Sequence, residues 1–219
     1  MPRLGMGTWM LGEHLSIYQQ EKKALQAGLD AGFTLIDTAE MYGNGLSEKL
    51  IGDTIQGYSR EKLFLVSKVY PHNAGRPQIY DSIDQTLHNL KTDYLDMYLI
   101  HWPLPNPKYK DWKELDVETW RGLEELYKAG KVKAIGVSNF LLHHLENLIQ
   151  NCEIMPMADQ IEFHPGQMQE ETVSYCKDHN IIVEAWSPLG TGRMLSNEML
   201  KSIAAKYGKS AAQLCIRWC

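Results

Sequence analysis

The sequence predicts an α/β fold in which parallel strands alternate with helices and curl into a (β/α)8 TIM barrel. Short apolar runs alternate with stretches of helical periodicity along the whole chain, which has no linker or low-complexity segment. Nearly continuous apolar strands indicate a parallel sheet covered by helices. Polar or ionisable residues stand where successive runs end, and a barrel gathers such strand ends at one mouth.

Seven apolar runs have the length and composition of strands, and turns or polar residues bound each of them. They predict strands over residues 4–7, 34–37, 63–68, 94–101, 134–137, 158–161 and 181–186. Between them lie apolar stripes with helical spacing. These predict helices over about 21–31, 47–55, 79–90, 120–127, 141–149, 171–179 and 197–207, and one more from 211 onward.

Local signals support the elements in the first half of the chain. Gly32 follows the last apolar turn of the first helix and suits a helix C-cap. A Gly-Asn-Gly turn over 43–45 separates the second strand from its helix and would hold Tyr42 in place. The third helix carries one apolar stripe, made of Ile79, Ile83, Leu87 and Leu90.

The second half continues the same alternation. A loop punctuated by three prolines, Pro103, Pro105 and Pro107, separates the fourth strand from its helix. That helix turns Trp120 and Leu123 inward, and Gly130 ends it. We therefore expect one domain over 1–219, which is long enough for one sizeable core.

The barrel prediction has one competing fold and one missing strand. A doubly wound open sheet is the competing fold, but no Gly-x-Gly-x-x-Gly opens a helix after the first strand. The seven strands stop one short of closure, and a barrel without its last strand exposes two long parallel edges. We therefore expect the natural protein to continue beyond Cys219 into an eighth strand.

Composition excludes several classes of partner. The net charge of −5 is mild, and the scattered Lys and Arg residues form no footprint for nucleic acid or anionic lipid. No apolar stretch is long enough to span a membrane, and no signal peptide opens the chain, so the cytoplasm is expected. The four cysteines show no paired spacing and are expected to be reduced thiols.

Four ionisable groups are expected at the ends of three successive strands. Asp37 ends the second strand, with Tyr42 in the loop that follows; Lys68 ends the third strand and His101 the fourth. A tyrosine is a poor acid near neutral pH, but a nearby ammonium such as that of Lys68 lowers its pKa. Asp37 would keep the Lys68 ammonium charged, and His101 would hydrogen-bond the substrate oxygen. This set predicts carbonyl reduction by hydride, with Tyr42 as the proton donor.

The chain resembles the aldo-keto reductase superfamily, and within it the bacterial enzymes of the diketogluconate reductase and glyoxal reductase type. The resemblance spans nearly the whole chain and rests on motifs in a fixed order. These are Gly5-Met6-Gly7-Thr8-Trp9, Asp37-Thr38-Ala39 with Tyr42-Gly43, Lys68, His101-Trp102-Pro103, Gly136-Val137-Ser138-Asn139-Phe140, Gln160-Ile161-Glu162-Phe163-His164-Pro165 and Trp186-Ser187-Pro188-Leu189-Gly190.

The resemblance implies a catalytic tetrad and an NADPH site, with NADH left open as the cofactor. The tetrad would be Asp37, Tyr42, Lys68 and His101. The cofactor would be held by Thr8, Trp9, Asp37, Ser138, Asn139, Gln160, Trp186, Ser187, Leu189 and Arg193. Trp9 and Trp102 would wall the substrate pocket beside Tyr42 and His101. Against the family pattern, we expect residues 1–219 not to include the N-terminal hairpin, the eighth strand with its 2′-phosphate-binding segment, or the C-terminal substrate loop.

The leading hypothesis is therefore NADPH-dependent reduction of a small aldehyde or ketone by a monomer that needs no metal. One alternative is a cofactor-binding, redox-sensing subunit of the same fold with little turnover. Another is a metal-dependent hydrolase barrel, for which only His101 and His164 offer themselves as histidine ligands. His164 is interpreted as structural.

Overall fold

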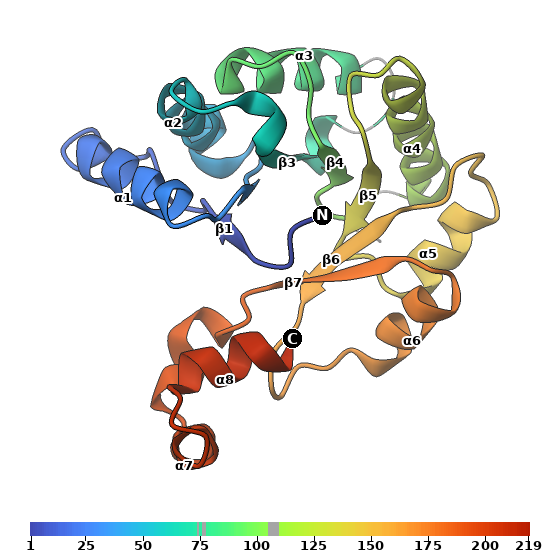
Figure 1. The fold of residues 1–219 in the computed structure, drawn as a ribbon. Helices are drawn as coiled ribbons and strands as arrows, with labels where there is room; N and C mark the ends of the chain where they lie inside the picture. The colour runs from blue at the N-terminus through green and yellow to red at the C-terminus, as the bar shows by residue number, and fades with distance from the viewer. Residues whose placement is uncertain (74, 76–77, 105–109) are drawn as a thin grey trace.

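The computed structural model describes residues 1–73, 75, 78–104 and 110–219, and its centre is one parallel sheet. Seven strands follow one another in sequence order across the sheet, and each pairs in parallel with the next. The strands are β1 (Gly5–Gly7), β2 (Leu35–Asp37), β3 (Phe64–Val69), β4 (Met97–Ile100), β5 (Ile135–Ser138), β6 (Ala158–Glu162) and β7 (Ile182–Trp186). The sheet curls into a half-barrel, which agrees with the predicted (β/α)8-type fold (Figure 1).

Helices α1 to α6 connect the strands and lie on the outer side of the curved sheet, and α7 and α8 follow the last strand (Figure 1). They are α1 (Tyr18–Asp30), α2 (Leu46–Ile55), α3 (Gln78–Leu90), α4 (Trp112–Lys128), α5 (Leu142–Ile149), α6 (Glu170–Asp178), α7 (Glu198–Ala205) and α8 (Ala211–Trp218). Short 3₁₀ segments add η1 (Tyr42–Gly45), η2 (Arg60–Lys62), η3 (Pro71–Asn73) and η4 (Gly190–Ser196). The helices α7 and α8 pack against each other and against η4.

Each predicted strand and helix is present, with shifts at the ends. The largest shift is in α4, which begins at Trp112 instead of about 120. Among the strands the largest is in β4, which covers Met97–Ile100 instead of the predicted 94–101, because Leu95 makes only an isolated bridge to Val132. Pro105 and Pro107 of the predicted proline loop lie outside the described residues. All four cysteines are free, as expected. Among the described residues, no helix has the length and apolar character needed to cross a membrane.

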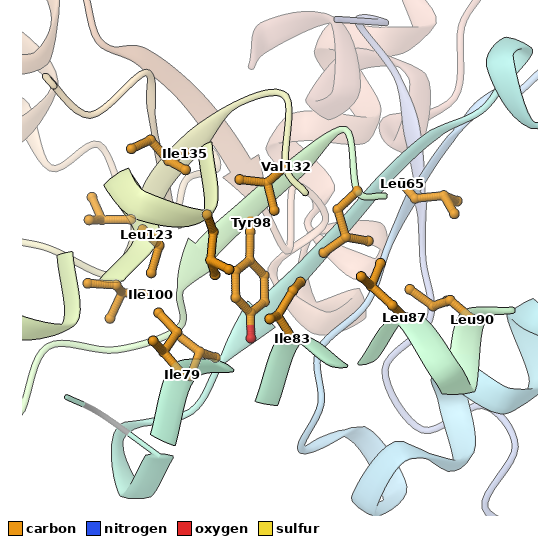
Figure 2. Close-up of a cluster of buried hydrophobic side chains, with 14 of the residues drawn as sticks. Leu65, Ile79, Ile83, Leu87, Leu90, Tyr98, Ile100, Leu123, Val132 and Ile135 are labelled. Atoms are coloured by element: carbon orange, nitrogen blue, oxygen red, sulfur yellow. The ribbon is translucent and has the colours of Figure 1, made fainter. Parts of the chain in front are cut away.

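The strands divide their side chains between two apolar clusters, because alternate residues of a strand point to opposite faces. The larger, outer cluster lies between the sheet and the helices. In Figure 2, Ile79 and Ile83 of α3 lie near Tyr98 of β4, and Leu87 and Leu90 of α3 lie on the side of Leu65 of β3. The smaller, inner cluster consists of Leu35, Val66, Met97, Leu99 and Ala158.

The same alternation positions the candidate site. Asp37 lies two residues after Leu35, Lys68 two after Val66, and His101 two after Leu99, so all three point to the inner face. They therefore form the next layer of the half-barrel, at the carboxyl ends of the strands, where such folds carry their reactive groups.

A tight helix contact supports this layer from outside. In α2, a methyl group added at Gly52 would lie 2.3 Å from the Asn89 carbonyl oxygen of α3. We expect Gly52→Ala to lower the free energy of unfolding by about 1–3 kcal/mol through overpacking. Urea unfolding of the two proteins measures the difference. Gly57→Ala is the control, because a methyl group there meets nothing within 4 Å. Equal stabilities of both variants would contradict the close helix contact.

Candidate active site

The Lys68 ammonium is the most deeply buried charge of the site. The residue is 0% exposed, and its Nζ donates to Asp37 Oδ1 at 2.7 Å and to the Thr38 carbonyl oxygen at 2.9 Å. Burial lowers the pKa of Lys68, but Asp37, followed by Tyr42, outweighs burial and leaves this pKa above its ordinary value. The ammonium therefore stays charged and fixed between β2 and β3.

Tyr42 reaches this pair because the chain turns sharply after it. Gly43, Asn44 and Gly45 all adopt left-handed backbone angles, with φ of 55°, 50° and 84°, which glycine and asparagine tolerate best. Lys68 Nζ lies 5.2 Å from the centre of the Tyr42 ring. The Gly-Asn-Gly turn thus holds the phenol beside the ammonium, as the sequence suggests.

The pKa of Tyr42 departs from the simple expectation. Burial raises it and is the largest effect, Lys68 lowers it, and Asp37 raises it again. Lys68 acts in the predicted direction, but the net pKa lies above the ordinary value because burial disfavours the phenolate. In this state of the protein Tyr42 is a protonated phenol throughout the neutral range.

His101 directly follows β4 and lies beside the phenol. Its ring centre lies 5.6 Å from that of Tyr42, edge to face, and the residue is 7% exposed. Burial, with a smaller contribution from Lys68, lowers the pKa of His101 to about 3. The imidazole is therefore neutral at physiological pH. Its Nδ1 is buried and has no hydrogen-bond partner among the described residues.

Side-chain amides gather at the ends of β5 and β6. Asn139, with a left-handed φ of 64°, donates from Nδ2 to the His101 carbonyl oxygen at 3.0 Å and accepts from Trp186 Nε1 at 2.9 Å. Ser138 Oγ donates to the Gln160 carbonyl oxygen at 2.8 Å. The structure thus brings together Ser138, Asn139, Gln160 and Trp186, four of the residues that the resemblance assigns to the cofactor.

One hydrogen bond joins the amides to the charged pair. Gln160 Nε2 donates to Asp37 Oδ2 at 2.8 Å, while Lys68 holds the other carboxylate oxygen of Asp37. The charged pair and the amides at the ends of β5 and β6 therefore form one hydrogen-bonded group. Asp37 accepts hydrogen bonds from both Lys68 and Gln160, so any shift of its carboxylate would disturb both contacts.

The remaining predicted cofactor residues are more widely spread. Thr8 is fully buried, and its hydroxyl donates to the Asp37 carbonyl oxygen and accepts from Ser47 Oγ, so it acts within the protein. Leu189 precedes η4, and Ser187 has a left-handed φ of 49°. Arg193 extends from η4 with an exposed guanidinium 3.6 Å from Glu162 Oε1.

Exposed tryptophans follow two of the strands that carry the site. Trp9 comes two residues after β1 and is 64% exposed, and Trp102 follows His101 and is 44% exposed. Large aromatic surface open to water near a polar centre is typical of ligand contact. His164, in contrast, is buried and bonded to the Pro165 carbonyl oxygen, as suits a structural residue.

A second set of hydrogen bonds fixes the loops around the site. Glu40 accepts from the Tyr70 backbone N–H at 2.5 Å and from Ser82 Oγ at 2.8 Å, which ties the Tyr42 loop to α3. Glu48, fully buried in α2, accepts from Ser67 Oγ of β3 at 2.8 Å and from Asn89 Nδ2 at 3.0 Å. Both carboxylates have their charge spread over several donors.

Sequence reasoning missed one ionisable residue at this site. Glu184 lies in β7 opposite Gln160, and its pKa responds to both Asp37 and Lys68. Its only signal in the sequence is a carboxylate inside the apolar run Ile181-Ile182-Val183-Glu184-Ala185. Over the residues that the structure describes, no three His, Cys, Asp or Glu side chains gather into a group that could hold a metal ion.

The chain is similar to known proteins over its whole length. The model of the aldo/keto reductase family matches residues 3–219. The glyoxal reductase of Bacillus subtilis is 44% identical over 220 residues, which are 100% of this chain and 74% of that protein. The methylglyoxal reductase DkgA of Escherichia coli is 37% identical over 222 residues, which are 100% of this chain and 75% of that protein.

Solved structures share the architecture. The crystal structure of an aldo/keto reductase from Brucella melitensis has a TM-score of 0.88 at 40% identity, covering 100% of this chain and 79% of that one. The aldo/keto reductase from Klebsiella pneumoniae in complex with NADP and acetate has a TM-score of 0.89 at 35% identity, covering 100% and 77%.

The neutral state of His101 is testable by titration. We expect its imidazole to stay unprotonated down to about pH 5, because burial holds its pKa near 3 while an unfolded histidine titrates at about 6.5. The stability that this depressed pKa contributes is present above about pH 6.5 and is lost as the pH falls toward 3. Histidine ¹³Cε1 NMR, assigned with His101→Gln, measures the midpoint. A midpoint for His101 near that of histidines in the denatured protein would contradict a buried, neutral imidazole.

Proposed function

Because this chain belongs to the aldo/keto reductase family, we propose that it reduces small aldehydes or ketones to alcohols with NADPH. The observation that carries the proposal is the 2.8 Å hydrogen bond from Gln160 to Asp37. It places the amides that suit a nicotinamide directly against the charged pair beside Tyr42. A cofactor ring held by these amides would lie next to the proton donor.

The residues present fit a nicotinamide cofactor. A carboxamide both donates and accepts hydrogen bonds, and the side-chain amides of Asn139 and Gln160 offer both functions. Trp186 adds a flat aromatic side chain bonded to Asn139. Ser187, Leu189 and Arg193 lie in the segment from β7 through η4 and are proposed to contact the pyrophosphate side. When bound, NADPH supplies a hydride to the carbonyl carbon.

The protein's own residues handle the carbonyl oxygen. Tyr42, a protonated phenol, donates its proton to that oxygen as negative charge develops on it. Lys68 stays charged beside the phenol and stabilises the phenolate that remains. The neutral imidazole of His101 donates a hydrogen bond to the same oxygen and orients it. Asp37 keeps the ammonium in place throughout.

The names of two relatives suggest the class of substrate. Two relatives are named glyoxal reductase and methylglyoxal reductase, and we propose a small aldehyde or dicarbonyl of that kind for this chain. Trp9 and Trp102 are proposed to wall its pocket. We further propose a cytoplasmic protein, because four free thiols suit a reducing compartment.

The proton donor is tested by Tyr42→Phe. We expect kcat for NADPH-dependent reduction of methylglyoxal to fall by at least about 10²-fold, because the variant lacks the general acid. The loss of NADPH absorbance measures the rate. The control is Tyr207→Phe, at an exposed tyrosine after α7, which should keep the wild-type rate. Wild-type protein that binds NADPH without turnover would instead support a cofactor-binding subunit.

The cofactor site is tested by Asn139→Gly. Glycine keeps the left-handed backbone and removes only the amide, so we expect the Kd for NADPH to rise about tenfold, the effect of one lost hydrogen bond. Fluorescence titration with NADPH, and with NADH in parallel, measures binding. The matched control is Asn180→Gly, at an exposed position with φ of 58°. An unchanged Kd in Asn139→Gly would remove Asn139 from the proposed site.

A further inference from the structure

Glu184 belongs to the same inner layer as the charged pair. Its strand neighbour Val183 packs against the outer apolar cluster, so Glu184 points to the inner face. There it lies opposite Gln160, the residue that donates to Asp37. Its Oε2 is buried and has no hydrogen-bond partner among the described residues. A buried carboxylate oxygen without a donor is costly, which sets Glu184 apart from Glu40 and Glu48.

The charged groups that act on Glu184 come from two other strands. Asp37 of β2 is the negative one and Lys68 of β3 the positive one, while β6 contributes the neutral amide of Gln160. β6 also carries the carboxylate of Glu162 two residues further along the same face. Helix α6 packs against β7 on the outer face. Its buried thiol, Cys176, lies in the same cluster as Val183 and so on the opposite side of the strand from Glu184. Burial, followed by Asp37, raises the pKa of Glu184 to about 7, and Lys68 and Gln160 oppose this.

The influence is mutual. The charge of Glu184 is among the interactions that raise the pKa of Lys68. When Glu184 is ionised, two carboxylates act on one ammonium, and the excess negative charge disfavours a phenolate at Tyr42. When Glu184 is protonated, the Asp37–Lys68 pair is balanced, and the same ammonium favours the phenolate more strongly.

We propose that Glu184 is a positioning residue that acts through its charge on the Asp37–Lys68 pair and so sets the proton affinity of Tyr42. The inference rests on the proposed function of Tyr42 as proton donor and deepens it. Above its own midpoint, Glu184 keeps Tyr42 protonated to higher pH and so extends the range in which the phenol can serve as an acid. Below that midpoint it makes the phenol a stronger acid.

The first test is the pH profile of kcat for NADPH-dependent reduction of methylglyoxal. The wild-type profile is expected to show an inflection near pH 7 and a fall at alkaline pH. In Glu184→Gln the inflection should disappear and the alkaline fall should move to lower pH by about 0.5–1 unit. Glu184→Asp, which keeps the charge, should restore both. Glu153→Gln, at an exposed glutamate, is the control and should follow the wild type.

A second test needs no turnover. With ¹³Cζ-labelled tyrosine, the NMR signal of Tyr42 is identified by its loss in Tyr42→Phe and followed against pH. In the wild type it should move first near neutral pH, as Glu184 titrates, and again when the phenol ionises. In Glu184→Gln the step near neutral pH should vanish, and the midpoint of the phenol ionisation should fall by about 0.5–1 pH unit. Circular dichroism confirms that each variant is folded.

The outcomes separate the two proposals. A wild-type protein without turnover whose Tyr42 signal still responds to Glu184→Gln would overturn the reductase function and keep the coupling. An identical alkaline midpoint in wild type and Glu184→Gln, by either measurement, would overturn the role of Glu184. If Glu184→Gln does not fold, absence of the neutral step in the wild-type Tyr42 signal overturns it.

Discussion

A single buried ammonium is the constraint on which the site depends. Lys68 has no contact with water, and removing such a charge from water is costly unless an opposite charge and further acceptors replace the lost hydration. Asp37, the last residue of β2, and the carbonyl oxygen of Thr38, which follows it, provide this replacement. The ion pair therefore fixes the ends of β2 and β3 relative to each other, and the Tyr42 loop begins from that fixed point.

The surrounding polar groups are arranged so that they do not compete for this ammonium. Glu40 and Glu48 are two further carboxylates close to the site, yet each has its own set of hydroxyl, amide or backbone donors. Those donors hold the Tyr42 loop, α2 and α3 together. Asp37 and Glu184 are thus the carboxylates left to respond to the state of Lys68.

Much of the fold could be predicted because it follows from local patterns. Apolar runs of strand length and helical stripes are read directly from the chain, and the residue that ends each run identified Asp37, Lys68 and His101. Glu184 could not be found in this way, because its importance comes from β7 lying beside β6 and facing strands far away in sequence. The direction of the Tyr42 pKa shift could not be predicted either, because it depends on the balance between the effect of burial and the opposing effects of Lys68 and Asp37. Thr8 carries a family motif, but only the structure shows that its hydroxyl is used inside the protein.

The unequal sizes of the two apolar clusters bear on how such a protein can change during evolution. The large outer cluster supplies most of the buried apolar surface, and none of the residues at the site belongs to it. The inner cluster is small and lies beneath the reactive layer. Substitutions on the inner face can therefore alter chemistry while the outer packing keeps the chain folded. Directed evolution of new carbonyl preferences should accordingly sample inner-face and strand-end positions, and leave the helix-facing residues unchanged.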